Sequence, residues 1–302
     1  MKKFLCICLS STIQRTVSFD EVRLEKVNRS KHYRQDASGK AVNSARVLNQ
    51  MQKGCAVCVC PLGQKNKELF LELASSDGLK IDYVEIPGFT RECWTLLDGT
   101  KATTTELVVG EPSFDFDRTS KENEICLLVE KELNECDAVL IAGSRPVYFS
   151  DDFISRISKM IFKSGKIFLA DFHGKDLLST LKCGTPAAIK INDDEFISTF
   201  GLDSDISDEV LKEKIIEKSK ELSSIVIVTR GTKSTFAADC GKFLEHPVEK
   251  LRAVNTTACG DSFSAGFLYE YVLNSDLEKA IEKGTWCASR NAMSEVPGSI
   301  LD

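Results

Sequence analysis

One short stretch near the end of the chain combines small residues with a carboxylate at the start of a predicted helix. Residues 255–268 read NTTACGDSFSAGFL, so Ala258, Cys259 and Gly260 directly precede Asp261. Unpaired backbone N–H groups at a helix N-terminus, aided by the helix dipole, form a site for an anion such as phosphate. A carboxylate beside that site can stay ionised and accept a proton from an attacking hydroxyl group. The stretch indicates phosphoryl transfer with Asp261 as the base; the alternative is that Asp261 only caps the helix.

The rest of the sequence contains neither a Walker A loop nor a Rossmann dinucleotide-binding loop, and its cysteine pattern does not favour a metal centre. Four Gly-Lys pairs occur, but none has the glycine spacing or the following Ser or Thr of a Walker A loop. No G-x-G-x-x-G follows a predicted strand, so a Rossmann dinucleotide site has no support. The C-x-x-C from Cys55 to Cys58 has no second pair and lies among small and β-branched residues. A buried strand is therefore favoured over a zinc site.

Composition and charge exclude several classes of protein. The chain has 302 residues, 42% hydrophobic and 28% charged, with a net charge of −6 and mixed signs along its length, so a nucleic-acid partner is not expected. No apolar run approaches the ~20 residues of a membrane-spanning helix. Most of the twelve cysteines lie in apolar runs, where a free thiol acts as a small hydrophobe. A reducing, cytoplasmic location is the expectation.

Short apolar runs alternate with amphipathic segments about every 25 to 30 residues, which is typical of repeated βα units. This pattern predicts an α/β fold with a mostly parallel sheet and helices on both of its faces. The predicted strands are 4–9, 12–19, 55–60, 80–86, 137–142, 166–170, 187–191 and 224–229. The predicted helices are 40–52, 65–77, 120–134, 150–163, 207–220, 260–273 and 277–293.

Residues 90–109 interrupt the alternation. Asp98-Gly99 stands between two β-prone runs, which is a strong signal for a hairpin. Together with the strand at 12–19, this hairpin is expected to form a small sheet that projects from the main body and covers a site. The predicted lid comprises approximately residues 11–36, including a polar loop up to Asp36, and 88–112. No repeat or low-complexity linker divides the chain, so 1–302 is expected to be a single domain.

The stretch 255–268 resembles the D/N-T-x-G-A-G-D-S-F-x-A-G-F signature of the ribokinase-like carbohydrate kinases, the PfkB group. Residues 37–46, ASGKAVNSAR, resemble that family's N-terminal signature G-G-K-G-x-N-x-A-R. Between them lie weaker similarities in the same order: GSRP at 143–146, KINDDE at 190–195 and TRGTKS at 229–234. The resemblance thus covers essentially the whole chain.

Two further matches narrow the resemblance. Thr90-Arg91 and Thr105-Glu106-Leu107 are similar to the branch that contains 1-phosphofructokinase and tagatose-6-phosphate kinase, whose substrates already carry a phosphate. The resemblance implies a three-layer α/β/α core of ribokinase type with a small β-sheet lid, and a homodimer through that lid. It implies ATP-dependent phosphorylation of a sugar phosphate to a bisphosphate, with ATP and Mg²⁺ as cofactors. The alternatives are a kinase of an unphosphorylated sugar or nucleoside, and a non-catalytic sugar-phosphate-binding relative.

Roles follow from the resemblance position by position. Asp261 becomes the catalytic base, and the backbone of Ala258, Cys259 and Gly260 the anion hole. The implied substrate-binding residues are Gln14, Gly39, Lys40, Asn43, Arg91 and Ser144. Of these, Lys40 and Arg91 would bind the phosphate that the substrate already carries. The implied nucleotide-binding residues are Lys190, Thr229 and Gly231. Asn192 and Glu195 would hold magnesium through water, whereas local sequence alone favours a helix capping pair for them.

Several positions depart from the family pattern. Gln14 stands where the family has an aspartate that binds sugar hydroxyls, and it carries no charge. Ser38, Ala41 and Ala258 replace glycines of the two signatures. Wherever the backbone there requires positive φ, each replacement is expected to cost about 1 kcal/mol. Arg145 replaces a leucine, which is expected to add a positive charge and a phosphate contact near the sugar site.

Overall fold

The computed structural model describes residues 1–111 and 116–301. Its main sheet has nine strands in the order β13-β12-β11-β10-β9-β8-β1-β4-β5. All neighbours in this sheet are parallel except that β12 runs antiparallel to both β11 and β13. The strands are β1 (Phe4–Ile7), β4 (Ala56–Gly63), β5 (Lys80–Ile86), β8 (Ala138–Ala142), β9 (Ile167–Asp171), β10 (Ala188–Asn192), β11 (Ile225–Thr229), β12 (Thr235–Asp239) and β13 (Lys242–His246).

The side chains of the central strands alternate between two apolar layers. Along β1, Phe4 and Cys6 belong to one buried cluster, whereas Leu5 and Ile7 belong to the other. The first cluster packs under α1 (Lys40–Met51), α2 (Lys67–Ser76), α8 (Cys259–Asn274) and α9 (Leu277–Ala292). The second packs under α3 (Arg118–Leu133), α4 (Phe153–Ser164), α5 (Gly174–Leu181), α6 (Asp193–Phe200) and α7 (Asp208–Leu222). Strands buried on both faces explain the nearly continuous apolar runs, and the predicted three-layer α/β fold is confirmed.

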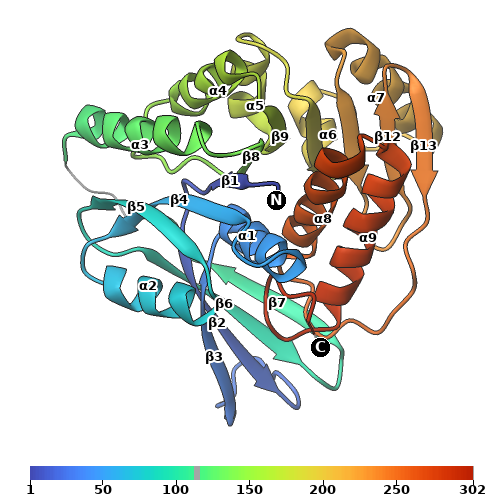
Figure 1. Cartoon of the computed structure of the whole chain (residues 1–302). Helices are drawn as coiled ribbons and strands as arrows, with labels where there is room; N and C mark the ends of the chain where they lie inside the picture. The colour runs from blue at the N-terminus through green and yellow to red at the C-terminus, as the bar shows by residue number, and fades with distance from the viewer. Residues whose placement is uncertain (112–115, 302) are drawn as a thin grey trace.

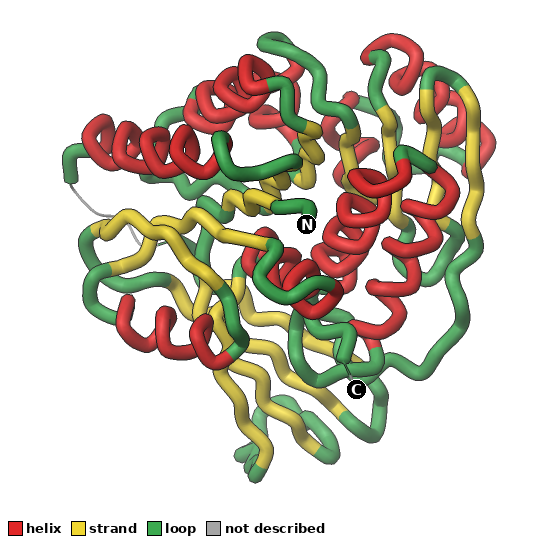
Figure 2. Tube along the Cα trace, viewed as in Figure 1, coloured by secondary structure: helices red, strands yellow, loops and turns green. Residues whose placement is uncertain are grey.

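A second sheet of four strands, in the order β3-β2-β6-β7, projects from one end of the main body (Figures 1 and 2). Its strands are β3 (His32–Ser38), β2 (Thr12–Phe19), β6 (Arg91–Asp98) and β7 (Thr103–Val108). The predicted hairpin at Asp98-Gly99 is confirmed, because β6 and β7 are antiparallel neighbours across it. Parallel register pairs Thr12 with Arg91 and Gln14 with Cys93, so these four side chains share one face.

Some elements differ from the predictions. The loop predicted up to Asp36 is wrong, because β3 begins at His32 and pairs with β2 along its whole length. Its sequence HYRQDAS is polar since β3 is an edge strand of a small sheet, and it therefore lacks apolar alternation. The predictions also omit the short helices α5 and α6 and the strands β12 and β13. Residue 112, the end of the second predicted lid segment, lies outside the described residues.

Within the described part of the chain, every helix is too short or too polar to cross a bilayer.

Gly63 sits where the end of β4 meets the start of the second sheet. A Cβ on Gly63 would lie 2.1 Å from the Thr90 nitrogen and 2.2 Å from the Phe89 carbonyl carbon. We predict that Gly63→Ala lowers the free energy of unfolding by about 1–3 kcal/mol, because backbone must move to admit the methyl group. Urea unfolding measures this loss. Gly110→Ala is the control, since a Cβ there would meet no atom of the described residues within 4 Å; equal losses in both variants would contradict the prediction.

Candidate active site

A cavity of about 250 Å³ lies between the second sheet and the N-termini of α1 and α8. The carboxyl ends of parallel strands share one edge of a sheet, and the helix N-termini that follow them meet there. Seven of the predicted site residues line this cavity: Gln14, Gly39, Lys40, Asn43, Arg91, Ala258 and Asp261. The other lining residues are Thr12, Ser38, Cys93, Trp94, Glu106, Val108 and Thr257.

Helix α8 starts abruptly at the cavity, with Ala258 in the left-handed conformation as its N-cap (φ 67°). Among the described residues, the N–H groups of Ala258 and Gly260 have no acceptor, whereas the Cys259 N–H donates to the Thr256 carbonyl at 3.3 Å. A Cβ on Gly260 would lie 2.9 Å from the Lys190 Nζ, so the ammonium group sits against this glycine. Two free amides and one cation therefore meet at this helix start, and the Cys259 amide of the predicted anion hole is already used.

Asp261 is buried at the end of the cavity, in the first turn of α8, with 6% of its surface exposed. Its Oδ2 accepts a hydrogen bond from the Asn43 Nδ2 at 2.8 Å. The Ser44 Oγ donates to its backbone carbonyl at 2.9 Å, which joins α1 to α8. Burial raises the pKa of Asp261 to about 6, while Lys40 and the Asn43 hydrogen bond oppose that rise. The carboxylate is therefore ionised at neutral pH yet basic enough to take a proton.

Asp171, the last residue of β9, is a buried carboxylate that the sequence analysis did not single out. Its Oδ2 contacts the Lys190 Nζ at 3.2 Å and accepts from the Ser264 Oγ at 2.6 Å. Its Oδ1 has no hydrogen-bond partner among the described residues and lies 3.9 Å from the Lys40 Nζ. Burial alone would raise the pKa of Asp171, but Lys190 and Lys40 outweigh it and lower that pKa. The sequence does carry a signal for Asp171, because this carboxylate directly follows the predicted strand 166–170.

Lys40 lies between two carboxylates. Its Nζ is 3.6 Å from the Glu195 Oε1, and the His173 Nε2 lies at the same distance from that oxygen. Burial would lower the pKa of Lys40, but Asp171, Glu195 and Asp261 together raise it, so the side chain is a fixed positive charge. This ammonium connects the cavity to the ends of β9 and β10.

Asn192 and Glu195 form a capping box at the start of α6. The Asn192 Oδ1 accepts from the Glu195 N–H at 2.7 Å, and the Glu195 Oε2 accepts from the Asn192 N–H at 3.0 Å. The capping interpretation made from local sequence is therefore confirmed. It still leaves the Glu195 Oε1 directed at Lys40.

The floor of the cavity is formed by the inward face of the second sheet. The Gln14 Nε2 donates to the Thr95 Oγ1 at 2.8 Å, and that hydroxyl lies 3.3 Å from the Thr257 Oγ1 of the loop before α8. The Arg91 Nε donates to the Thr12 Oγ1 at 3.0 Å and pairs with the Glu111 carboxylate at 3.3 Å. The Gln14 and Arg91 side chains thus line the cavity while contacting Thr95 and Thr12 of their own sheet, and Arg91 also pairs with Glu111 beyond the end of β7.

Eight of the fifteen predicted site residues do not line the cavity: the five described above, Cys259, Gly260, Lys190, Asn192 and Glu195, and three others, Ser144, Thr229 and Gly231. Ser144 is exposed in the loop after β8. Thr229 ends β11 beside Asn192 of β10, and Gly231 follows in an exposed turn with φ 60°. All three follow strands at the carboxyl edge of the sheet, and Thr229 and Gly231 lie on the side of the α6 N-terminus.

Two expectations about departures from the family pattern need correction. Arg145 offers no free charge to the cavity, because its guanidinium donates to the Phe149 carbonyl and to the carboxylates of Asp151 and Asp176. Of the three glycine replacements, only Ala258 has positive φ. Ser38 lies in a strand and Ala41 in a helix, so the cost of about 1 kcal/mol applies at Ala258 alone.

Asn291 on α9 also escaped the sequence analysis. It is fully buried; its Nδ2 donates to the Thr257 carbonyl at 2.8 Å, and its Oδ1 accepts from the Gly298 N–H at 2.7 Å. It thereby fixes the loop before α8 to the C-terminal segment. No local pattern marks a single asparagine within a helix, so this role was visible only in three dimensions.

The model of the pfkB family of carbohydrate kinases matches residues 3–298, and the chain belongs to this family. The protein is therefore a sugar kinase. Kinases of this family use ATP, usually with Mg²⁺.

Solved structures share the fold across nearly the whole chain. Phosphofructokinase-2 from Escherichia coli, in complex with potassium, aligns with TM-score 0.86 at 16% identity, over 98% of this chain and 94% of that chain. A possible 1-phosphofructokinase from Thermotoga maritima aligns with TM-score 0.87 at 17% identity, over 98% and 93%. Ribokinase from Thermotoga maritima aligns with TM-score 0.73 at 18% identity, over 100% and 96%. At these identities the similarity shows the fold, and the predicted ribokinase-like architecture is confirmed.

The raised pKa of Asp261 leads to a prediction about stability. The folded chain takes up a proton at Asp261 near pH 6, whereas the unfolded chain does so near the ordinary value of 3.8. The contribution of Asp261 to the free energy of unfolding therefore falls as the pH rises from about 4 to about 6, and the loss of that contribution is complete above that window. We predict that Asp261→Asn is more stable than the wild type by about 3 kcal/mol at pH 8 and equally stable near pH 4. Urea unfolding at both values measures this; a pH-independent difference would contradict it.

Proposed function

We propose that this sugar kinase transfers the terminal phosphoryl group of ATP to a hydroxyl of a sugar phosphate, of the fructose 1-phosphate or tagatose 6-phosphate type, and so makes a sugar bisphosphate. The observation that carries the proposal is the buried carboxylate of Asp261, with a pKa of about 6, beside free amides at the start of α8 and within a cavity that contains two cationic side chains. Family membership supports the reaction class, and the two cations, Lys40 and Arg91, support a phosphorylated acceptor.

The proposed mechanism uses Asp261 as the general base. Its carboxylate accepts the proton of the acceptor hydroxyl while that oxygen bonds to the terminal phosphorus and the bond from phosphorus to the ADP oxygen breaks. The N–H groups of Ala258 and Gly260 would stabilise the charge on the transferred group, with Cys259 as the residue between them. Phosphoryl transfer depends mainly on positioning and charge stabilisation, which this arrangement supplies.

The acceptor would lie in the cavity along the backbone of Gly39 and the amide of Asn43. Among the described residues, Arg91 contacts its neighbours through Nε alone, so its terminal nitrogens remain for two parallel hydrogen bonds to a phosphate. Lys40 would supply the second positive charge, and Gln14 would bind sugar hydroxyls as an uncharged donor and acceptor. Ser144, in the exposed loop after β8, is proposed to close the substrate site from the outside.

The nucleotide would lie along the carboxyl edge of the sheet, on Lys190, Thr229 and Gly231. Magnesium keeps several waters and usually takes only one or two carboxylates, so water-mediated contact with Asn192 and Glu195 fits the donors present. The Asp171 Oδ1, which accepts no hydrogen bond from the described residues, supports that fit. When bound, the ion would neutralise charge on the ATP phosphates.

The second sheet is proposed to be a lid within one kinase domain spanning 1–302. Two contacts support this: the Thr95 Oγ1 meets the Thr257 Oγ1, and the Thr256 N–H donates to the Thr104 Oγ1 at 3.3 Å. Exposed apolar side chains of the sheet that do not line the cavity, Tyr33 and Leu107 among them, support a homodimer formed through the lid. The inhibited form of Escherichia coli phosphofructokinase-2 is a tetramer. A cytoplasmic location is supported by the twelve free cysteines.

We predict that Asp261→Asn lowers kcat by about 10²- to 10⁴-fold, because the base is removed, while the sugar phosphate still binds. A coupled assay of ADP release measures turnover, and calorimetry measures binding. Asp176→Asn on α5, outside the cavity, is the control and should turn over normally. Near-normal turnover by Asp261→Asn would refute the mechanism. Sugar-phosphate binding by the wild type without any ATP turnover would favour the non-catalytic alternative.

A second prediction concerns the acceptor. Escherichia coli phosphofructokinase-2 has been solved in complex with fructose-6-phosphate, and ribokinase from Thermotoga maritima shares the fold. We expect fructose 1-phosphate, tagatose 6-phosphate or fructose 6-phosphate to exceed ribose and adenosine in kcat/KM. Arg91→Ala should raise KM for the phosphorylated acceptor at least about 10-fold, since a charged hydrogen-bond pair is lost. An unchanged KM, or a preference for ribose or adenosine, would instead support the unphosphorylated acceptor.

A further inference from the structure

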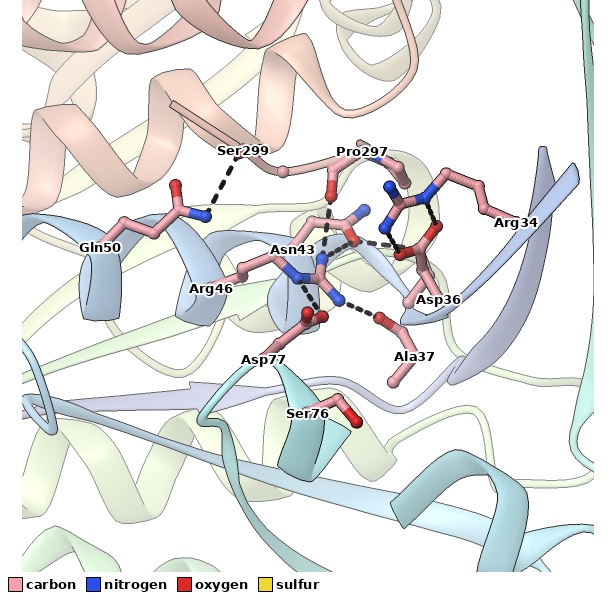
Figure 3. A network of polar contacts seen from close by, with 12 residues as sticks. Arg34, Asp36, Ala37, Asn43, Arg46, Gln50, Ser76, Asp77, Pro297 and Ser299 are labelled. Carbon is pink, nitrogen blue, oxygen red and sulfur yellow. Dashed lines mark hydrogen bonds and ion pairs between the residues drawn. The ribbon is translucent and has the colours of Figure 1, made fainter. Parts of the chain in front are cut away.

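Arg46 is a buried arginine with 2% of its surface exposed. Figure 3 shows it among its polar partners. It lies on α1, one helical turn after Asn43. Its Nε donates to the Asp77 Oδ2 at 2.8 Å, and its Nη1 donates to the Pro297 carbonyl at 2.9 Å. Its Nη2 donates to the Ala37 carbonyl at the end of β3. Taking a guanidinium out of water is costly unless its donors are used, so this network holds the side chain in one place.

The fourth partner of Arg46 is the side chain of Asn43. The Asn43 Oδ1 accepts from the Arg46 Nη1 at 3.1 Å and from the Ser38 Oγ at 2.9 Å. Arginine can only donate, so the oxygen of the amide must face Arg46 and its nitrogen must face the other way. That nitrogen is the donor to the Asp261 Oδ2. A rotation of the Asn43 amide would put an oxygen against the Asp261 carboxylate and leave Arg46 facing an N–H group.

We propose that Arg46 is a positioning residue for Asp261: it fixes the Asn43 amide so that an N–H donor always faces the carboxylate. The inference rests on the proposed role of Asp261 as base. Through its other partners, Arg46 ties that orientation to the end of β3, to the end of α2 and to the C-terminal segment. Gly298 packs on the same asparagine, because a Cβ there would lie 2.8 Å from the Asn43 Cβ.

The charged and titratable groups that face Asp261 come from four elements: Lys40 of α1, Asp171 of β9, Lys190 of β10 and Cys259 of α8. None of these four is a partner of Arg46 within the described residues. The influence of Arg46 on the carboxylate therefore passes through Asn43. The Asn43 hydrogen bond favours the ionised form and lowers the pKa of Asp261. Losing the fixed donor raises that pKa.

The test is a ¹³C NMR titration of aspartate-labelled full-length protein, with the Asp261 signal assigned by its absence in Asp261→Asn. We expect Arg46→Met to raise the titration midpoint of Asp261 by about one pH unit, as for loss of a hydrogen bond to a charged group. Arg46→Lys, which keeps a donor, should shift it less. The acid limb of the kcat/KM profile should move to higher pH by the same amount. The titration needs no turnover, so it separates this inference from the proposed kinase activity.

Asp77→Asn is the matched control, because it weakens the Arg46 network while leaving the contact with Asn43. It should lower stability toward urea without moving the Asp261 midpoint. In an Asn43→Ala background, Arg46→Lys should add no further shift, since the intermediary is gone. An unchanged midpoint in a folded Arg46 variant overturns the proposal.

Ser38→Ala provides a second test of the proposal. This variant keeps Arg46, so the test does not require Arg46→Met to fold. We expect it to shift the Asp261 midpoint by less than half as much as Arg46→Lys does, since the guanidinium still holds the amide oxygen. A larger shift would assign the orientation of Asn43 to Ser38 and overturn the proposal.

Discussion

The structure of the site depends on keeping one carboxylate ionised where little water reaches it. Burial disfavours the charge of Asp261, and three opposing contributions limit the penalty: the positive charges of Lys40 and Lys190 and the N–H of Asn43. The start of α8 adds a favourable dipole at the same place. These contributions leave the pKa of Asp261 at about 6. This value lies above that of a freely solvated aspartate and below that of a buried carboxyl group that would stay protonated at neutral pH. The surrounding architecture is what brings the compensating groups within reach.

The parallel topology of the main sheet brings these compensating groups close to Asp261. Each strand of the main sheet that precedes a site residue ends at the same edge, so residues far apart in sequence arrive side by side. Asp171 ends β9 and Asn192 ends β10, while α1 and α8 start at the same edge from opposite ends of the chain. The direct bonds between Asn43 or Ser44 of α1 and Asp261 of α8 then join those two helices. The second sheet, which is built from two separate segments of the chain, lies across this edge and completes the lining of the cavity.

Sequence reasoning succeeded where the signal was local. The loop before α8, the hairpin at Asp98-Gly99 and most strands of the sheet are each encoded within a dozen or so residues, by turn residues or by apolar runs. It failed at β3, whose polar residues gain their conformation from pairing with β2, and at short helices such as α5. Asp171 and Asn291 were missed for a related reason: each is an ordinary polar residue at the end or middle of an element. Only the packing of distant segments gives them their partners.

The replacement of a family aspartate by Gln14 fits the charge balance of the cavity. The lining already contains two carboxylates, Asp261 and Glu106, and two cations, Lys40 and Arg91. A third carboxylate at position 14 would add a like charge to the same space and would disfavour ionisation of the base. Gln14 avoids that cost while its amide remains hydrogen-bonded to Thr95. The neutral side chain therefore adds no like charge that would raise the pKa of Asp261 further, and so preserves the protonation state on which the proposed chemistry depends.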